Sequence, residues 1–484
     1  MILSNSVRLA TYMIGVAADQ ISVPTSERFN TAYIYAISTV AALGGLLFGY
    51  DWVVIGGAKP FYEKFFGLSD PSQQGWAMSC ALVGCLIGAL VCGSLSDRFG
   101  RKLLLIIAAL VFAVSSIGTA MASSFSLFAP WRILGGFAIG MASGLSPMYI
   151  AEVAPAHFRG KLVSLNQLTI VVGILLAQVV NWLIAKPVPV DATATQILQS
   201  WNGQVGWRWM FGVTAIPSTF FFIAMFTVPE SPRWLAKNGA RERAKAVLSR
   251  IGGASYGARA LGEIEATVAE QTTQADLQAL LNPRMLKVLL LGIVLAVLQQ
   301  WCGINVIFNY AEEVFSAAGY KVSDILFNIV VTGAVNLVFT FVAIGLVDRH
   351  GRRALMLIGS AGLAIIYTSL GALFYVHSHG VHMLVLVVAA IGCYAMSLAP
   401  VTWVVISEIF PNRIRGAAMS VAVTALWIAS FILTYTFPLF NHSLGAATTF
   451  WLYAGICLVG FLFIRARLPE TKGKTLEQIE ECWK

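Results

Sequence analysis

Long apolar runs alternate with short polar segments along most of the chain. A helix needs about 20 residues to cross the roughly 30 Å hydrocarbon core of a bilayer, and twelve runs approach or exceed that length. The pattern therefore predicts twelve transmembrane helices. They are expected near residues 32–56, 76–96, 103–122, 127–150, 162–185 and 208–228, and then near 286–309, 325–347, 354–376, 381–406, 416–438 and 448–467.

The longest polar segment, residues 229–284, separates two sets of six apolar runs. Its mixture of acids and bases suits short amphipathic helices on the membrane surface, and a plain linker between two halves is the alternative. The predicted organisation is an N-terminal segment (1–30), a six-helix bundle (31–228), the amphipathic linker (229–284), a second six-helix bundle (285–468) and a tail (469–484).

Basic residues are concentrated in alternate loops, for example at 98–102 and 349–353, whereas the loops between them carry more acids. Lys and Arg are enriched in cytoplasmic loops of membrane proteins. The basic loops, both termini and the linker are therefore predicted to face the cytoplasm, with the bundles in the inner (plasma) membrane.

The composition supports a multi-pass membrane protein. Of the 484 residues, 58% are hydrophobic and only 11% are charged, and the mean hydropathy is +0.76. Soluble proteins carry about a quarter charged residues, so a soluble multidomain enzyme is excluded, as is a disordered chain. The cytoplasmic loops account for the net charge of +9, so no nucleic-acid partner is expected. Neither a nucleotide motif nor a CxxC pair occurs, so we expect no enzyme activity, cofactor or metal site.

Three motifs in the first half recur in the same order in the second. GSLSDRFGRK at 93–102 returns as IGLVDRHGRR at 344–353, and EVAPAHFRG at 152–160 returns as EIFPNRIRG at 408–416. The tripeptide PES at 229–231 returns as PET at 469–471. Such repeats are typical of transporters whose two halves move around a site at the membrane midplane. We therefore predict an all-α membrane protein with two pseudo-symmetric six-helix bundles.

Each repeat places acids and bases at helix–loop–helix corners on the predicted cytoplasmic face. The interpretation we favour is a charge network that closes this face in one conformation and breaks in another. The alternative is a set of loop cations with incidental partners. The predicted gate residues are Asp97, Arg101, Glu152, Arg159, Asp348, Arg352, Glu408 and Arg415.

Several of these motifs resemble the sugar porter branch of the major facilitator superfamily. They include GGLLFGYD at 44–51, PMYIAEVAP at 147–155, PESPRWL at 229–235 and PETKG at 469–473. The resemblance runs from about Tyr33 to Lys484 and is nearest to bacterial xylose/proton symporters. It implies the major facilitator fold, alternating access and a monosaccharide-like substrate.

Two opposite charges lie in predicted spans: Asp51 in the first and Arg132 at the start of the fourth. A charge inside the bilayer is costly and normally faces a cavity or a partner. A nearby cation favours a charged carboxylate, and removal from water favours a neutral one. Asp51 is therefore predicted to carry a proton and Arg132 to modulate it. In the family that the chain resembles, proton-coupled members have an acid at this position. The alternatives are a static salt bridge and an aspartate near extracellular water.

Amide and tryptophan side chains within apolar spans suit a sugar, which offers hydroxyl groups and apolar faces. Gly303 is expected to break the seventh span so that amides converge on a cavity. The alternatives are amides that bind neighbouring helices and tryptophans that only pack. By resemblance, the substrate-binding residues are Gln167, Gln299, Gln300, Asn305, Asn336, Trp403 and Trp427.

The chain departs from the family at three positions near this predicted site. Ile174 and Leu426 stand where the xylose symporters have amides, and Asn309 stands where tyrosine is expected. A site built for a hydroxyl group rejects analogues that lack it, so these changes are expected to shift specificity.

The sequence therefore predicts a secondary active transporter that imports a monosaccharide (a pentose, a hexose or a related polyol) by proton symport. The alternatives are an uncoupled uniporter, a sugar sensor that does not transport and a drug exporter. The expected partners are the sugar, protons and membrane lipids, and the protein is expected to be monomeric.

Overall fold

The computed structural model describes residues 29–188, 193–270, 282–317, 319, 322–378, 380–410 and 415–472. The predicted N-terminal segment up to residue 28 and the tail beyond residue 472 lie outside the described residues. The side chains of Asp348 and Arg415, both predicted gate residues, also lie outside the described part of the molecule.

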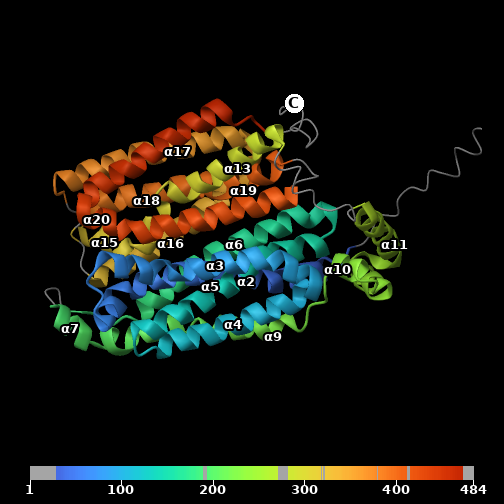
Figure 1. The fold of residues 1–484 in the computed structure, drawn as a ribbon, viewed down its shortest axis with the longest axis horizontal. Helices are drawn as coiled ribbons and strands as arrows, with labels where there is room; N and C mark the ends of the chain where they lie inside the picture. Colours follow the sequence, from blue (N-terminus) through green and yellow to red (C-terminus); the bar gives the residue numbers. More distant parts are fainter. Residues whose placement is uncertain are drawn as a thin grey trace, which may run out of the picture.

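The first half consists of long helices joined by short turns, as the alternation of apolar runs and polar segments predicts (Figure 1). Its sixth span begins with a short π-helical segment and follows a small helix, α7 (Ala194–Gln199). The long helices are α2 (Thr31–Phe66), α3 (Pro71–Phe99), α4 (Arg101–Met121), α5 (Phe125–Val153) and α6 (Ala156–Ile184), and the sixth span comprises η1 (Asn202–Gly206), α8 (Trp207–Gly212) and α9 (Ala215–Met225).

The second half repeats this arrangement with more interruptions. Its first span is divided at Gly303 and its fourth at residues 396–397. The helices are α13 (Pro283–Trp301), α14 (Ile304–Asn309), α15 (Ala311–Ala317), α16 (Val322–His350), α17 (Arg352–Tyr375), α18 (Val381–Ala395), α19 (Leu398–Ile409) and α20 (Arg415–Arg467).

Among the described residues, eleven helical stretches are long and apolar enough to cross a membrane. The last, α20, has 53 residues, which corresponds to about 80 Å at 1.5 Å per residue. That is far more than one crossing requires. Non-helical dihedral angles at Gly445 (φ 77°, ψ 164°) divide α20 into two spans. The described helices thus form twelve spans, and the predicted all-α membrane fold is confirmed.

The two halves lie side by side as separate bundles, blue to green and yellow to red in Figure 1. They meet where α3 packs on α20, α6 on α16, and α2 on α14 and α15. The linker helices α10 (Pro232–Lys237) and α11 (Arg241–Glu270) lie at one end, together with the corners rich in arginine. We call this the basic end, and we call the opposite end, which carries α7 and α15, the distal end.

Large apolar side chains cover the outer surface of both bundles. Ile216 is 69% exposed and Val459 is 67% exposed, for example. Water would not solvate such a surface, whereas lipid tails do. By contrast, many of the polar side chains within the spans are buried in the interior.

Glycine forms the matching corners that the repeat predicts. Gly100 ends α3 with φ 91°, and Gly351 ends α16 with φ 86°. Non-glycine residues rarely adopt these angles. A Cβ atom at Gly100 would also overlap the carboxylate of Glu230, and one at Gly351 would lie 2.7 Å from the carboxylate of Glu470. Both corners therefore depend on glycine for conformation and for space.

Candidate functional site

Close packing of α2 against α6 positions the acidic side chain of the first span. A Cβ atom at Gly49 would overlap the backbone carbonyl of Ile170, and one at Gly173 would overlap that of Leu46. Small residues of this kind allow membrane helices to approach closely. The glycines of the GGLLFGYD motif thus fix the position of Asp51, which follows two residues after Gly49.

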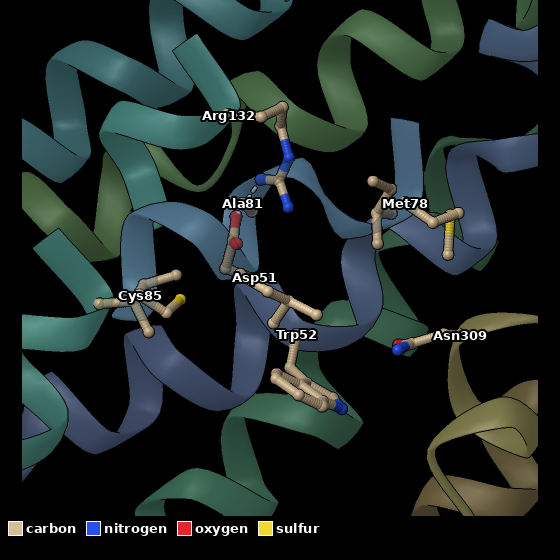
Figure 2. Close-up of a pocket in the computed structure, with 10 residues that line it drawn as sticks. Asp51, Trp52, Met78, Ala81, Cys85, Arg132 and Asn309 are labelled. Carbon is tan, nitrogen blue, oxygen red and sulfur yellow. Dashed lines mark hydrogen bonds and ion pairs between the residues drawn. The ribbon is translucent and has the colours of Figure 1, made fainter. Parts of the chain in front are cut away.

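Asp51 and Arg132 form a buried ion pair between α2 and α5 (Figure 2). Arg132 Nη1 donates to Asp51 Oδ1 at 2.5 Å, and the two residues are 4% and 6% exposed respectively. The guanidinium also lies 5.2 Å from the ring centroid of Phe211. Removing either partner would leave an uncompensated charge in an apolar interior, which is costly.

A small cavity adjoins this ion pair and reaches the boundary between the two halves. Trp52 and Met78 line it from the first half, and Asn309 of α14 lines it from the second. Figure 2 shows Asn309 on the opposite wall from Arg132. Asn309 Oδ1 is buried and has no hydrogen-bond partner among the described residues. The carboxylate of Asp51 therefore faces a space that both halves enclose.

Three of the predicted substrate amides form a hydrogen-bonded chain in the second half. Asn305 Nδ2 donates to Gln300 Oε1 at 2.5 Å, and Gln300 Nε2 donates to Gln299 Oε1 at 2.6 Å. Gln299 Nε2 donates to the hydroxyl of Tyr394 at 2.9 Å. All three amide residues are less than 8% exposed. The mutual bonds orient the amides without any ionised group.

The break at Gly303 makes this chain possible. Gly303 has φ 86° and lies between the end of α13 and the start of α14. A Cβ atom there would lie 2.8 Å from the ring of Tyr453. The interruption lets Asn305 turn back toward Gln300, five residues earlier, so the helix break expected at Gly303 is present.

Trp427 connects the two halves through aromatic contacts. It is 3% exposed, and its ring centroid lies 5.9 Å from that of Phe48 and 6.2 Å from that of Trp52. Trp52 also lines the cavity beside Asp51. A cluster of tilted rings from α2 and α20 thus connects the cavity beside the charged pair to the second half.

The other predicted substrate residues are not joined to the amide chain by any described hydrogen bond. Asn336 is 5% exposed, and Gln167 and Trp403 are half-buried. The apolar replacements Ile174 and Leu426 are both buried. Tyr394, the partner of Gln299, could not be singled out from the sequence because no motif surrounds it.

At the basic end, the charged corners of the first half form one local network. Arg101 Nε lies 3.0 Å from Glu152 Oε2, and Arg101 Nη2 lies 3.2 Å from Asp97 Oδ1. Asp97 also pairs with Lys237 of α10 at 3.0 Å. Arg159 instead donates from Nε to the backbone carbonyl of Ala151 at 3.1 Å.

The second half has a matching network. Arg352 Nη2 lies 3.1 Å from Glu408 Oε1, and Thr471 Oγ1 donates to Glu408 Oε2 at 2.6 Å. At the basic end, the ion pairs between described side chains each connect segments of one half or its linker, and none crosses to the other half.

Two glutamates outside the predicted set complete these corners. The carboxylate of Glu230 accepts from the backbone N–H groups of Arg101 and Lys102, and that of Glu470 accepts from those of Arg352 and Arg353. Each carboxylate therefore lies at a helix N-terminus, where the helix dipole favours negative charge. The repeated Pro-Glu dipeptide was the available sequence signal.

A further ion pair at the distal end was also missed. Lys59 of α2 lies 3.1 Å from Glu63 on the same helix and forms an ion pair with Glu313 of α15. The signal was a lysine within an apolar span, at the same end as an acidic loop.

Comparison with known proteins agrees with this geometry. A family model described as sugar (and other) transporter matches residues 37–483. The D-xylose-proton symporter of Escherichia coli (strain K12) is 39% identical over 95% of this chain and 97% of that protein. The arabinose-proton symporter of Bacillus subtilis (strain 168) is 39% identical over 96% of this chain and 97% of that protein.

Solved structures of the xylose transporter XylE from E. coli have the same fold. Its partially occluded inward open conformation gives a TM-score of 0.81 at 38% identity, covering 92% of this chain and all of that one. XylE bound to 6-bromo-6-deoxy-D-glucose gives 0.77 at 38% identity, covering 94% of this chain and 100% of that one. With its repeated corners, twelve spans and family match, this chain belongs to the sugar transporter family of the major facilitator superfamily.

Proposed function

We propose that this protein imports a monosaccharide together with protons by alternating access. The observation that carries the proposal is the buried Asp51–Arg132 pair beside a cavity that both halves line. The relatives named as D-xylose-proton and arabinose-proton symporters support it. We place the basic end in the cytoplasm of a bacterial-type inner membrane because of its arginine-rich corners.

In this mechanism, Asp51 binds and releases the coupled proton. The charged carboxylate pairs with Arg132 and so holds α2 to α5. A proton on Asp51 removes the charge and weakens this pairing, which frees α2 to tilt against α5. Since α2 also packs on α14 and α15, the ionisation of Asp51 is thereby linked to the position of the second half.

The sugar binds to the second half through neutral groups. Gln299, Gln300 and Asn305 each offer a donor and an acceptor, and two hydroxyl groups of a sugar can replace the bonds within the amide chain. The ring of Trp427 supplies an apolar face. Ile174 and Leu426 are apolar where the xylose symporters have amides, so we propose a pentose, a deoxysugar or a polyol with fewer hydroxyl contacts.

Reconstituted protein provides the test. Proteoliposomes are supplied with D-xylose, L-arabinose, D-glucose, a deoxyhexose or myo-inositol, and proton movement is followed with a pH-sensitive dye. The transported sugar should carry protons with it, and an imposed inward proton gradient should drive its accumulation. Sugar uptake without proton movement would identify an uncoupled uniporter instead.

A further inference from the structure

Three ionisable side chains meet where the two halves touch at the distal end. Lys59 and Glu63 lie one turn apart on α2, and Glu313 lies on α15 of the second half (at the left in Figure 1). Among ion pairs between described side chains, Lys59–Glu313 is the one that joins the two halves. The backbones are also close there: a Cβ atom at Gly56 would lie 2.9 Å from the carbonyl oxygen of Phe308. The distal end is therefore closed around this triad.

The triad contains two carboxylates and one ammonium group, and it is largely shielded from water. Lys59 is 2% exposed, and the side chains of Glu63 and Glu313 are 12% and 23% exposed. Glu63 Oε1 and Glu313 Oε2 are buried without a hydrogen-bond partner. With both carboxylates ionised, the triad would hold a net charge of −1 in this setting. Burial of an uncompensated charge is costly, and such a group tends to take up a proton instead.

Lys64, next to Glu63 on α2, is a further cation close to the triad, and the negative charge of Glu312 on α15 offsets it. On α2, Tyr62 donates its hydroxyl to the sulfur of Met78, and Lys64 donates to the carbonyl of Pro60 at 3.2 Å. Tyr310, whose ring centroid lies 5.7 Å from Lys59 Nζ, donates its hydroxyl to the carbonyl of Thr434.

The pKa of Glu313 agrees with the excess of negative charge in the triad. Burial raises the pKa of Glu313 from its ordinary 4.5 to about 8, in spite of the opposing effect of Lys59. Glu312 and Glu63 raise it further. A carboxyl in such a place holds its proton at neutral pH while the distal end is closed.

We propose that Glu63, Lys59 and Glu313 form a second proton-binding site, which takes up one proton from the outside as the distal end closes. This inference rests on the proposed function only for the orientation of the protein. The two carboxyls share the proton, so the triad titrates as one unit. When the halves separate, Glu313 regains water and the proton returns to the same compartment. The triad moves no proton across the membrane, but it makes closure easier in external acid.

The direction of the pH effect follows from linkage. The closed form binds the proton more tightly than the open form, so acid favours the closed form. The ratio of open to closed molecules should rise with pH between about 4.5 and about 8, by at most tenfold per pH unit. Below that range both forms are protonated, and above it neither form is, so the ratio levels off.

Spin-label distances across the distal end provide the test. Labels at Gln73→Cys on α3 and Ser443→Cys on α20 report on the two halves, and both native residues are exposed. The six native cysteines in the described part of the chain are buried, and Cys482 is replaced by serine. Asp51→Asn in every sample removes titration of the first ion pair. Distances between the labels are measured by electron paramagnetic resonance across this pH range, without sugar.

With the triad intact, the ratio of open to closed molecules should increase at least threefold between about pH 6.5 and about pH 7.5. Glu313→Gln and Glu63→Gln each leave one carboxylate for one ammonium group, so both variants should stay closed and lose the pH response. Glu312→Gln is the matched control, and it should keep the pH response, with the upper end of the response at a lower pH because Glu312 helps to raise the pKa of Glu313. Lys59→Met leaves two carboxylates without a counter-ion and should open the distal end most at alkaline pH.

Two results would overturn the proposal. One is a Glu313→Gln variant that opens at every pH, because the triad would then be a simple ion-pair latch. The other is a Glu313→Gln variant with the pH response of the intact triad. The measurement needs neither sugar nor transport, so a failure of the symport proposal would not change its outcome.

Discussion

The interior of the first half contains a charged pair, Asp51 and Arg132, beside buried amides such as Gln178, whereas the second half contains a chain of neutral amides from Gln299 to Asn305. The corners at the basic end, by contrast, match closely in the two halves. In each corner a glutamate that follows the bundle binds the first backbone N–H groups of a helix, so both copies use the same residue types. The interiors bind ligands, so one copy can carry a group that titrates and the other groups that recognise hydroxyls.

The largest effect should come from neutralising the charged pair. Asp51→Asn cannot exchange a proton, so sugar should no longer accumulate against its gradient. The intact protein should concentrate the sugar inside the proteoliposomes about tenfold for each unit of imposed pH difference. Sugar exchange should persist, because the amide chain is unchanged. Uptake of radiolabelled sugar and its counterflow, both in proteoliposomes, measure the two properties separately.

The matched control is Asp70→Asn, which neutralises an exposed acid just before the start of α3, outside the charged pair and the corner networks. It should preserve accumulation. Accumulation that survives Asp51→Asn would show that the titrating group lies elsewhere, and the functional contrast between the halves would then fail.

An intermediate effect is expected from the amide chain. Gln300→Ala removes the central member and leaves Gln299 and Asn305 without their partner. The loss of hydrogen bonds at a buried polar site costs about 1–3 kcal/mol, which corresponds to roughly 5- to 150-fold weaker sugar binding. Binding calorimetry would measure this change, and the proton-to-sugar ratio should stay the same. Gln204→Ala, at an exposed position near the distal end, should leave affinity unaltered; if both variants bind equally well, the amides serve packing alone.

A smaller effect should follow from the aromatic contact between the halves. Trp427→Ala removes the ring that contacts Phe48 and Trp52 and should raise the KM for transport about 3- to 10-fold, since such ring contacts contribute about 0.5–1.5 kcal/mol. Trp427→Phe retains an aromatic face and should recover most of the affinity. Equal KM values for both variants would assign the effect to size and not to the aromatic face.

The smallest effect is a loss of stability at the two corners, and it should be similar in both halves. Glu230→Gln and Glu470→Gln each weaken a helix N-terminus and should lower stability by similar amounts, about 1 kcal/mol each. Thermal unfolding in detergent would measure both variants. A large difference in stability between the two variants would contradict the view that the two corners stabilise their halves in the same way.

The pH dependence of the same corner has a defined sign. Burial raises the pKa of Glu470, but four backbone N–H groups that donate to its carboxylate outweigh this effect and lower the pKa below 4.5. The stabilisation is therefore complete at neutral pH and is lost as the pH falls through the lowered pKa. Glu470→Gln should reduce the loss of stability at low pH. If the variant loses as much stability in acid as the intact protein, groups other than Glu470 cause that loss.

Much of this molecule could be predicted from local patterns. The apolar runs marked the spans, and the helix break at Gly303 followed from a glycine within an otherwise apolar helix. The motif repeat located both corners, since the same residues return at matching positions. These features depend on neighbours in the sequence, which a linear reading can detect.

The remaining contacts depend on which distant helices meet. Gln299 donates a hydrogen bond to Tyr394, which is 95 residues away. Lys59 pairs with Glu313 because α2 of the first half packs against α15 of the second. Arg159 is an arginine in the repeated corner motif, yet its side chain turns to a backbone carbonyl. A sequence pattern supplies the residue types in such cases but does not choose among several partners within reach.

The length of α2 has a mechanical consequence. Its 36 residues extend about 54 Å, so a rotation of about 10° around its middle would shift each end by about 5 Å. One end adjoins the linker helix α11, where the backbone N–H of Asn30 donates to Ile251, and the other end carries Lys59. The facing span of the second half is divided at Gly303 and can flex there. The helix α2 therefore connects the two faces of the molecule as one element, and a displacement at the basic end is transmitted through it to the distal end.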